Sequence, residues 1–153
     1  FTKDKYAENW DYYETMCEAS SSLSYPVHAI CSADNRRMLS FRKYFMETVR
    51  MDIDDVHHCA WQGIHAGCAA GGYIAVLRGI FGVKLVDGEL VFIPSPVPFW
   101  EKVSMRFMYR GVSIKCSLTN TQLVIDIGEN TLKIKVNGKE QILNKKKIFI
   151  VEK

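Results

Sequence analysis

The chain has 153 residues, of which 48% are hydrophobic and 24% are charged. This balance excludes a disordered or fibrous protein, and the length suits one domain or two parts of domains that need a neighbour to complete their cores. Residues 1–82 carry 8 basic and 10 acidic residues, residues 83–153 carry 12 and 7, and the net charge is +3. The basic run 145–147 is typical of a solvated turn, so we expect no nucleic-acid partner.

The first part of the chain has the apolar spacing of helices, from Trp10 to about Phe81. One helix is predicted near residues 22–31, with Ser22 or Ser24 as its cap and Pro26 in its first turn. Its apolar face would consist of Leu23, Val27, Ile30 and Cys31.

Two further helices follow. The pattern over residues 38–49 predicts a half-solvated helix on the outside of the fold. Residues 64–81 are apolar nearly all round and rich in glycine and alanine, which favours a helix buried among others at close range. Three helices do not close a core, so this half would need more helices or self-association.

After Gly82 the apolar period changes to two. Short alternating segments flank the dipeptides Asp87-Gly88, Arg110-Gly111 and Asn137-Gly138, of which Asp-Gly and Asn-Gly are strong signals for tight hairpin turns. About eight short strands in an antiparallel sandwich are predicted. We therefore expect an α+β chain with domains at 1–82 and 83–153.

The cysteine pattern and the lack of a leader pattern at the start of the sequence predict a cytoplasmic protein. The five cysteines form no CxxC pair and lie mostly in apolar surroundings, which is typical of free thiols in a reducing compartment. The chain does not open on a secretory leader. The longest apolar window, 64–83, contains His65 and Arg78 and many glycines, so we expect no membrane span.

Two predicted helix starts could bind an anion. Ser20 to Ser24 include four serines ahead of one helix, and His65 lies at the start of the buried helix. Unpaired backbone N–H groups and the helix dipole favour anions at such ends, and hydroxyls with a histidine would complete a phosphate site. The alternative is that the serines only cap the helix and that His65 is a satisfied core histidine.

Other chemistry finds less support in the sequence. The spacing of His57, His58, Cys59, His65 and Cys68 matches no standard zinc pattern, so no metal is expected. The neighbouring acids Asp52, Asp54 and Asp55 follow a solvated helix, where a loop or capping role is ordinary. No residue stands out as a catalytic acid.

The order of several segments resembles glycoside hydrolase family 65, the family of maltose, kojibiose, nigerose and trehalose phosphorylases. The resemblance covers about residues 9–118, is carried by segments of the helical half and of the β half, and is weaker in the tail that follows. These segments are Asn9 to Glu14, Ser21 to Ile30, Arg50 to Val56, Gly63 to Gly72, Asp87 to Leu90, the Pro-rich stretch to Trp100, and Met105 to Gly111.

The resemblance implies the last helices of an (α/α)₆ toroid followed by a β-sandwich. It also implies an inverting phosphorylase, in which inorganic phosphate, as co-substrate, attacks an α-glucosyl unit while a glutamic acid protonates the leaving oxygen to give β-glucose 1-phosphate. By correspondence, Ser21, Ser22 and His65 would contact phosphate. The family's glutamic acid and sugar-binding residues would lie upstream of Phe1, so the chain alone is expected to be inactive, with no catalytic residue and no other cofactor.

The chain departs from the family at two positions and leaves two alternatives open. Ala19 stands where histidine is often found, and Gln62 where an acidic residue is common, which blurs the substrate subtype. One alternative is a hydrolase on the same scaffold, which would lack the phosphate site. The other is a non-catalytic partner domain. Expected partners of the complete enzyme are the disaccharide, phosphate, the upstream toroid segment and a second copy in a homo-oligomer.

Overall fold

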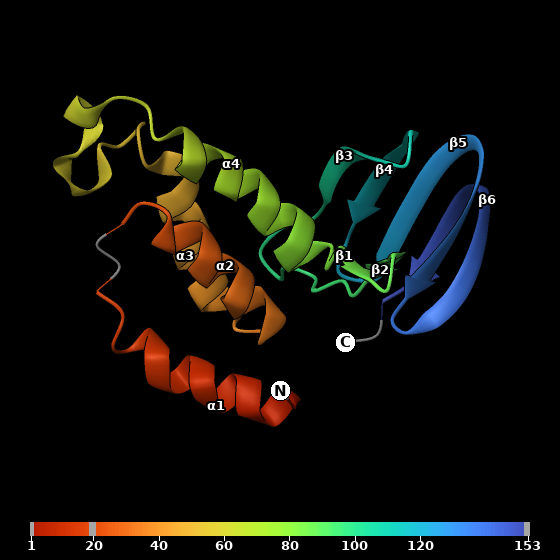
Figure 1. The fold of residues 1–153 in the computed structure, drawn as a ribbon, viewed down its shortest axis with the longest axis horizontal. Helices are drawn as coiled ribbons and strands as arrows, with labels where there is room; N and C mark the ends of the chain where they lie inside the picture. Colours follow the sequence, from red (N-terminus) through yellow and green to blue (C-terminus); the bar gives the residue numbers. More distant parts are fainter. Residues whose placement is uncertain (1, 19–20, 152–153) are drawn as a thin grey trace. The chain divides into compact units, whose positions relative to one another are not determined.

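The computed structural model describes residues 2–18 and 21–151 (Figure 1). Ala19 and Ser20, both named in the sequence analysis, lie outside the described residues. The chain divides into two compact units, residues 1–79 and 80–153. Within the described part of the chain, every helix is too short or too polar to cross a bilayer.

The first unit is helical. Helices are found where the sequence predicts them, and an additional one precedes them (Figure 1). They are α1 (Lys3–Glu14), α2 (Ser24–Asp34), α3 (Met38–Arg50) and α4 (Ala66–Ile74), which continues as the π-helix η3 (Ala75–Ile80). The loop between α3 and α4 holds two short 3₁₀ turns, η1 (Val56–His58) and η2 (Ala60–Gln62).

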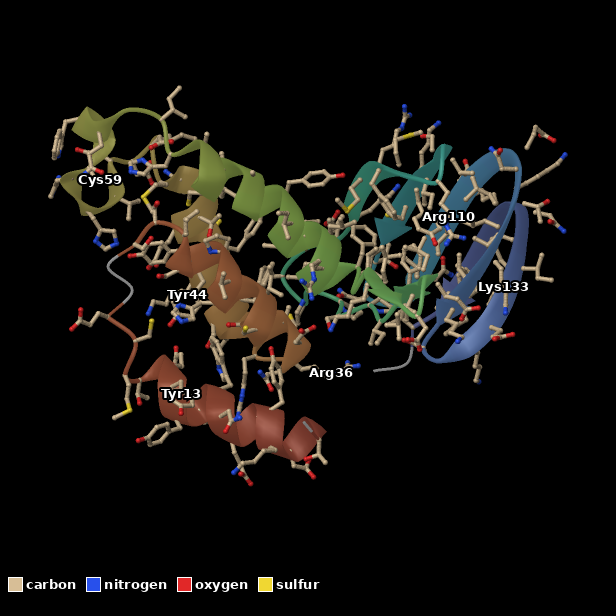
Figure 2. The ribbon with its side chains drawn as sticks, in the orientation of Figure 1. Tyr13, Arg36, Tyr44, Cys59, Arg110 and Lys133 are labelled. Atoms are coloured by element: carbon tan, nitrogen blue, oxygen red, sulfur yellow. The ribbon has the colours of Figure 1, made fainter. Side chains whose placement is uncertain are left out.

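Helix α1 packs through aromatic contacts. Trp10 is buried and meets the rings of His28 and Tyr44 edge to face, with centroids 5.6 and 6.4 Å away. The Tyr44 hydroxyl on α3 donates a hydrogen bond of 2.7 Å to Glu14 (Figure 2). Aromatic edge contacts of this kind stabilise helix packing, so α1 is held against both α2 and α3.

The predicted face and cap of α2 are wrong. The structure buries Tyr25, Ala29 and Ala33, whereas Leu23 and Val27 are 54% and 56% exposed. Glycines of α4 and of its continuation η3 approach α2 closely, at Pro26 and Ala33 among others, and these two residues belong to the buried face. Leu23 is the N-cap and makes no side-chain capping bond, while Ser21 Oγ accepts a hydrogen bond of 3.3 Å from the Leu23 N–H.

Helices α2 and α4 run parallel to each other. A Cβ built on Gly67 would lie 2.9 Å from Leu23 Cδ2, one on Gly71 would lie 2.5 Å from Pro26 Cβ, and one on Gly79 would lie 3.1 Å from Ala33 Cβ. The contacts therefore advance in the same direction along both helices, as Figure 1 also shows. The amino ends of α2 and α4 consequently lie at the same end of the pair.

The prediction that residues 64–81 are buried all round is only partly met in this chain. Cys68, Gly71 and Gly72 are buried on the side that faces α2 and α3. Ala69, Ala70 and Tyr73 are exposed on the other side. Small residues on all sides of a helix are typical of close packing on all sides. The described residues pack against only one side of α4.

The second unit is a curled sheet of six strands within residues 80–151 (Figure 1). The order is β1-β2-β5-β4-β3, and β6 also pairs with β5. The strands are β1 (Lys84–Val86), β2 (Glu89–Phe92), β3 (Val103–Tyr109), β4 (Val112–Leu118), β5 (Gln122–Val136) and β6 (Lys139–Ile150). The predicted hairpin turns are confirmed, because both central residues of each have positive φ, between 48° and 79°.

The sheet differs from the predicted one in two details. Its described pairings are antiparallel except that of β2 with β5, which is parallel. Strands β5 and β6 are long, 15 and 12 residues, so there are fewer strands than the eight predicted. Polar residues around the irregularity between Asp126 and Thr131 interrupt the apolar alternation, which makes one curved strand look like two short ones.

Gly82 fixes the start of the sheet unit. Its φ is +61°, and a Cβ at this position would overlap the backbone of Ile93. The Ile93 N–H donates a hydrogen bond of 3.1 Å to the Gly82 carbonyl. Only glycine permits this backbone angle and this close approach together.

Candidate functional site

The residues predicted to bind an anion lie around one end of the helical unit. Ser21 and Ser22 directly precede α2, and His65 is the N-cap of α4. Because α2 and α4 are parallel and Leu23 lies against Gly67, the structure brings both helix starts together. The two helix dipoles therefore direct their positive ends to one place.

His65 is held by Asp52 from the loop that follows α3. The Asp52 carboxylate accepts a hydrogen bond of 2.9 Å from the His65 backbone N–H, and its second oxygen lies 2.6 Å from His65 Nδ1. The side chains of His65 and Asp52 are 15% and 29% exposed. Since an ionised carboxylate can only accept, Nδ1 carries a proton, and Nε2 is the ring nitrogen left to bind a ligand.

The same loop also contacts the start of α2. The Tyr25 hydroxyl forms a short hydrogen bond with His57 Nε2, and the two rings stack with centroids 5.5 Å apart. His57 and His58 have positive φ values of 62° and 53°, which is uncommon for residues other than glycine. The loop, which includes Cys59 (Figure 2), is thus anchored at both helix starts.

Hydrogen bonding and burial shift the pKa values of Asp52 and Tyr25. The hydrogen bond from the His65 side chain is the main cause that lowers the pKa of Asp52, and burial is the main cause that raises the pKa of Tyr25. A lowered carboxyl pKa means that the contribution of Asp52 to stability is present above its ordinary pKa of 3.8 and is lost as the pH falls through the folded-state pKa. At neutral pH Asp52 is a carboxylate that can orient His65.

Replacing Asp52 with asparagine should weaken the binding of inorganic phosphate at the two helix starts. The amide oxygen can accept one of the two hydrogen bonds, but the NH2 group cannot accept the other, so the ring is no longer held with its proton on Nδ1. We expect the dissociation constant of inorganic phosphate, measured by titration, to rise by about tenfold. Asp54→Asn is the matched control, because Asp54 pairs with Arg50 instead; an equal effect of both changes would contradict the role of Asp52.

Asp52 is the site residue that the sequence analysis missed. It was given an ordinary loop or capping role with Asp54 and Asp55, and nothing local marks it, because its partner is 13 residues further along the chain. His57 and His58 do not join the proposed anion site through any described contact with His65. Among residues 2–18 and 21–151, no group of three or more His, Cys, Asp and Glu side chains could hold a metal ion.

The chain consists of a helical unit, in which two helix starts converge, followed by a β unit, and two known family domains match these parts. Residues 1–74 match the glycosyl hydrolase family 65 central catalytic domain, and residues 83–143 match the family 65 C-terminal domain. The chain therefore belongs to glycoside hydrolase family 65.

Curated relatives in this family include several glycoside phosphorylases. The chain is 54% identical over 114 residues to 3-O-alpha-D-glucosyl-L-rhamnose phosphorylase of Lachnoclostridium phytofermentans, a match that covers 74% of this chain and 15% of the relative. It is 36% identical over 129 residues to alpha,alpha-trehalose phosphorylase of Thermoanaerobacter brockii, covering 84% and 17%. The chain thus spans less than a fifth of the length of these relatives.

A solved structure shares the whole fold. It is provisionally named a kojibiose phosphorylase, from the human microbiome, and it matches with a TM-score of 0.92 at 22% sequence identity. The match covers 100% of this chain and 23% of that chain. The comparison confirms helices of the family's catalytic domain followed by its C-terminal β domain.

Proposed function

We propose that this chain supplies the phosphate site of an inverting family 65 phosphorylase that cleaves an α-linked glucose disaccharide. The observation that carries the proposal is the convergence of two helix starts with Ser21, Ser22 and the Asp52-held His65 around them. Helix starts and hydroxyls suit a phosphate ion as donors, and His65 Nε2 can accept a hydrogen bond from a protonated phosphate oxygen, or donate one when the ring is an imidazolium.

In this reaction a phosphate oxygen forms a bond to the anomeric carbon as the glycosidic carbon–oxygen bond breaks. A glutamic acid outside this chain gives its proton to the leaving oxygen, and the product is β-glucose 1-phosphate. The residues of this chain hold the nucleophile in place. Such positioning lowers the barrier because the attacking oxygen need not be recruited from solution.

The apolar surface of the helical unit fits a part of a larger toroid. Tyr13, Met16, Leu23 and Val27 are 54% to 63% exposed, and a hollow of about 550 Å³ lies between α1 and α2. Large exposed apolar patches mark contact surfaces. We propose that further helices of the complete enzyme cover these residues. The isolated chain would be inactive because the catalytic glutamic acid lies upstream of it. The same exposed surface also favours the alternative of a partner domain.

A hydrolase on the same scaffold is the alternative within the enzyme class. Inverting hydrolysis needs a carboxylate base that activates water opposite the acid. The acid nearest the helix starts, Asp52, accepts two hydrogen bonds from His65 and is engaged in orienting it. This arrangement favours a phosphate nucleophile over a water.

An assay of this chain, alone and mixed with the upstream segment of the enzyme, tests the proposal. We expect phosphate-dependent release of β-glucose 1-phosphate from one or more α-linked glucose disaccharides in the mixture, and none from the chain alone. Release by the chain alone would reveal a catalytic acid within it. Glucose release independent of phosphate would favour the hydrolase, and silence in both samples would favour the partner domain.

A further inference from the structure

The sheet unit carries a hollow on one face that the proposed phosphorylase reaction does not use. Its volume is about 410 Å³, within the range of about 300–1,000 Å³ of small-molecule sites. The side chains that line it come from β3, β4, β5 and β6 and from the residue just before β3. They are Lys102, Ser104, Met105, Arg106, Lys115, Cys116, Ser117, Val124, Asp126 and Lys146.

The strand register places four charged residues in one row across this face. Arg106 pairs with Lys115, Lys115 with Asp126, and Asp126 with Lys146. Directly paired residues present their side chains on the same face of a sheet, and neighbouring strands are about 4.8 Å apart. Arg106, Lys115 and Lys146 are exposed, so three cationic side chains project into the same hollow.

The basic residues that line the hollow outnumber the acidic one. Lys102, Arg106, Lys115 and Lys146 are basic, and Asp126 is the acid among the lining residues. Arg106 and Lys115 lie directly opposite each other on paired strands, where like charges repel. The Oδ1 atom of Asp126 accepts a hydrogen bond of 3.0 Å from the Gly128 N–H.

Two hydroxyls lie beside the row of charges. Ser104 and Ser117 are directly paired on β3 and β4, two residues from Arg106 and Lys115 on the same face. Hydroxyl groups can donate to phosphoryl oxygens, while arginine binds them through two parallel N–H groups. The hollow thus combines cations and hydroxyl donors over neighbouring strands.

We propose that this hollow binds a small anion with two or more phosphoryl charges, through Arg106, Lys115, Lys146 and the serine pair. A diphosphate matches the site better than a single phosphate, because the cations extend over several strands instead of converging on one point. The site belongs to the β unit and shares no residue with the helix starts. It therefore stands whether or not the phosphorylase proposal holds.

Titration of the chain with pyrophosphate, followed by amide chemical shifts, tests the site. We expect shifts at Lys115, Asp126 and Lys146, and an affinity that falls as salt is added. The double variant Arg106→Gln/Lys115→Gln should bind at least about tenfold more weakly. Asp126→Asn should bind more tightly, since it removes the competing carboxylate and keeps the acceptor for Gly128. Glucose 1-phosphate in a parallel titration distinguishes a phosphate monoester from a diphosphate.

The control removes the same charge elsewhere in the sheet. Lys133→Gln/Lys139→Gln changes exposed lysines of β5 and β6 that do not line the hollow; Lys133 pairs with Glu89 and Glu140 (Figure 2). We expect this variant to bind pyrophosphate as the parent chain does. Three results would overturn the proposal. Both double variants could bind pyrophosphate equally weakly, Asp126→Asn could bind it more weakly than the parent chain, or no amide of the sheet could shift at any pyrophosphate concentration. Because shifts are read by residue, binding at the helix starts is seen separately.

Discussion

Replacing His65 with alanine is expected to lower kcat/KM for phosphate by roughly ten- to a hundredfold in the complete phosphorylase. The change removes the imidazole, whose Nε2 we propose as a phosphate ligand. It leaves the backbone N–H of residue 65, which donates to Asp52, so the loop keeps one of its two bonds. The loss should therefore appear in the kinetics with phosphate and not in the KM for the disaccharide.

Two further variants separate phosphate binding from a structural effect. His58→Ala is the matched control, since the His58 side chain is 96% exposed and lies in the same loop; its kinetics should equal those of the parent. His65→Gln keeps an amide that can donate, and it should recover part of the activity. Unchanged phosphate dependence in His65→Ala would exclude His65 from the site.

The elements that local sequence determines were predicted best. The turns at Asp87-Gly88 and Asn137-Gly138 were predicted because aspartate, asparagine and glycine tolerate positive φ at two successive positions. The segments of α2, α3 and α4 were predicted from apolar spacing, from start signals before α2 and from the small residues of α4, whereas α1 was not predicted. These signals act over a few residues and do not depend on the rest of the fold.

Features that depend on distant residues were predicted poorly. The parallel pairing of β2 with β5 places Leu90 opposite Ile134. No local sequence pattern predicts a strand partner so far along the chain. The buried face of α2 is set by the glycines of α4, which accept Pro26 at close range. The partner helix decided which face is buried, and Leu23 and Val27 are 54% and 56% exposed although their spacing is apolar.

The candidate site shows the same division. Ser21, Ser22 and His65 were predicted from their places before helices and from family resemblance. The role of Asp52 emerges only when the loop after α3 folds back on the start of α4. The structure therefore adds to the sequence the residue that contacts the histidine and the packing that brings two separate helix starts together.

Gly71→Ala should destabilise the helical unit by about 1–3 kcal/mol, although alanine is intrinsically the better helix former. The new Cβ would lie 2.5 Å from both Cβ and Cγ of Pro26. The proline ring is rigid and buried, so α2 and α4 must move apart. Chemical denaturation of the chain measures the loss. In the complete enzyme, separated helix starts should also raise the KM for phosphate.

Gly67→Ala is the control that isolates the effect of this contact. Its Cβ would meet only Leu23 Cδ2, at 2.9 Å, and Leu23 is 54% exposed and can turn into solvent. We expect this variant to be as stable as the parent or more stable, because it gains helix propensity without separating the helices. If both substitutions had the same effect, the spacing of α2 and α4 would not be set by Gly71 and Pro26. If only Gly71→Ala weakened phosphate binding, the close parallel packing of the two helices would be what forms the site.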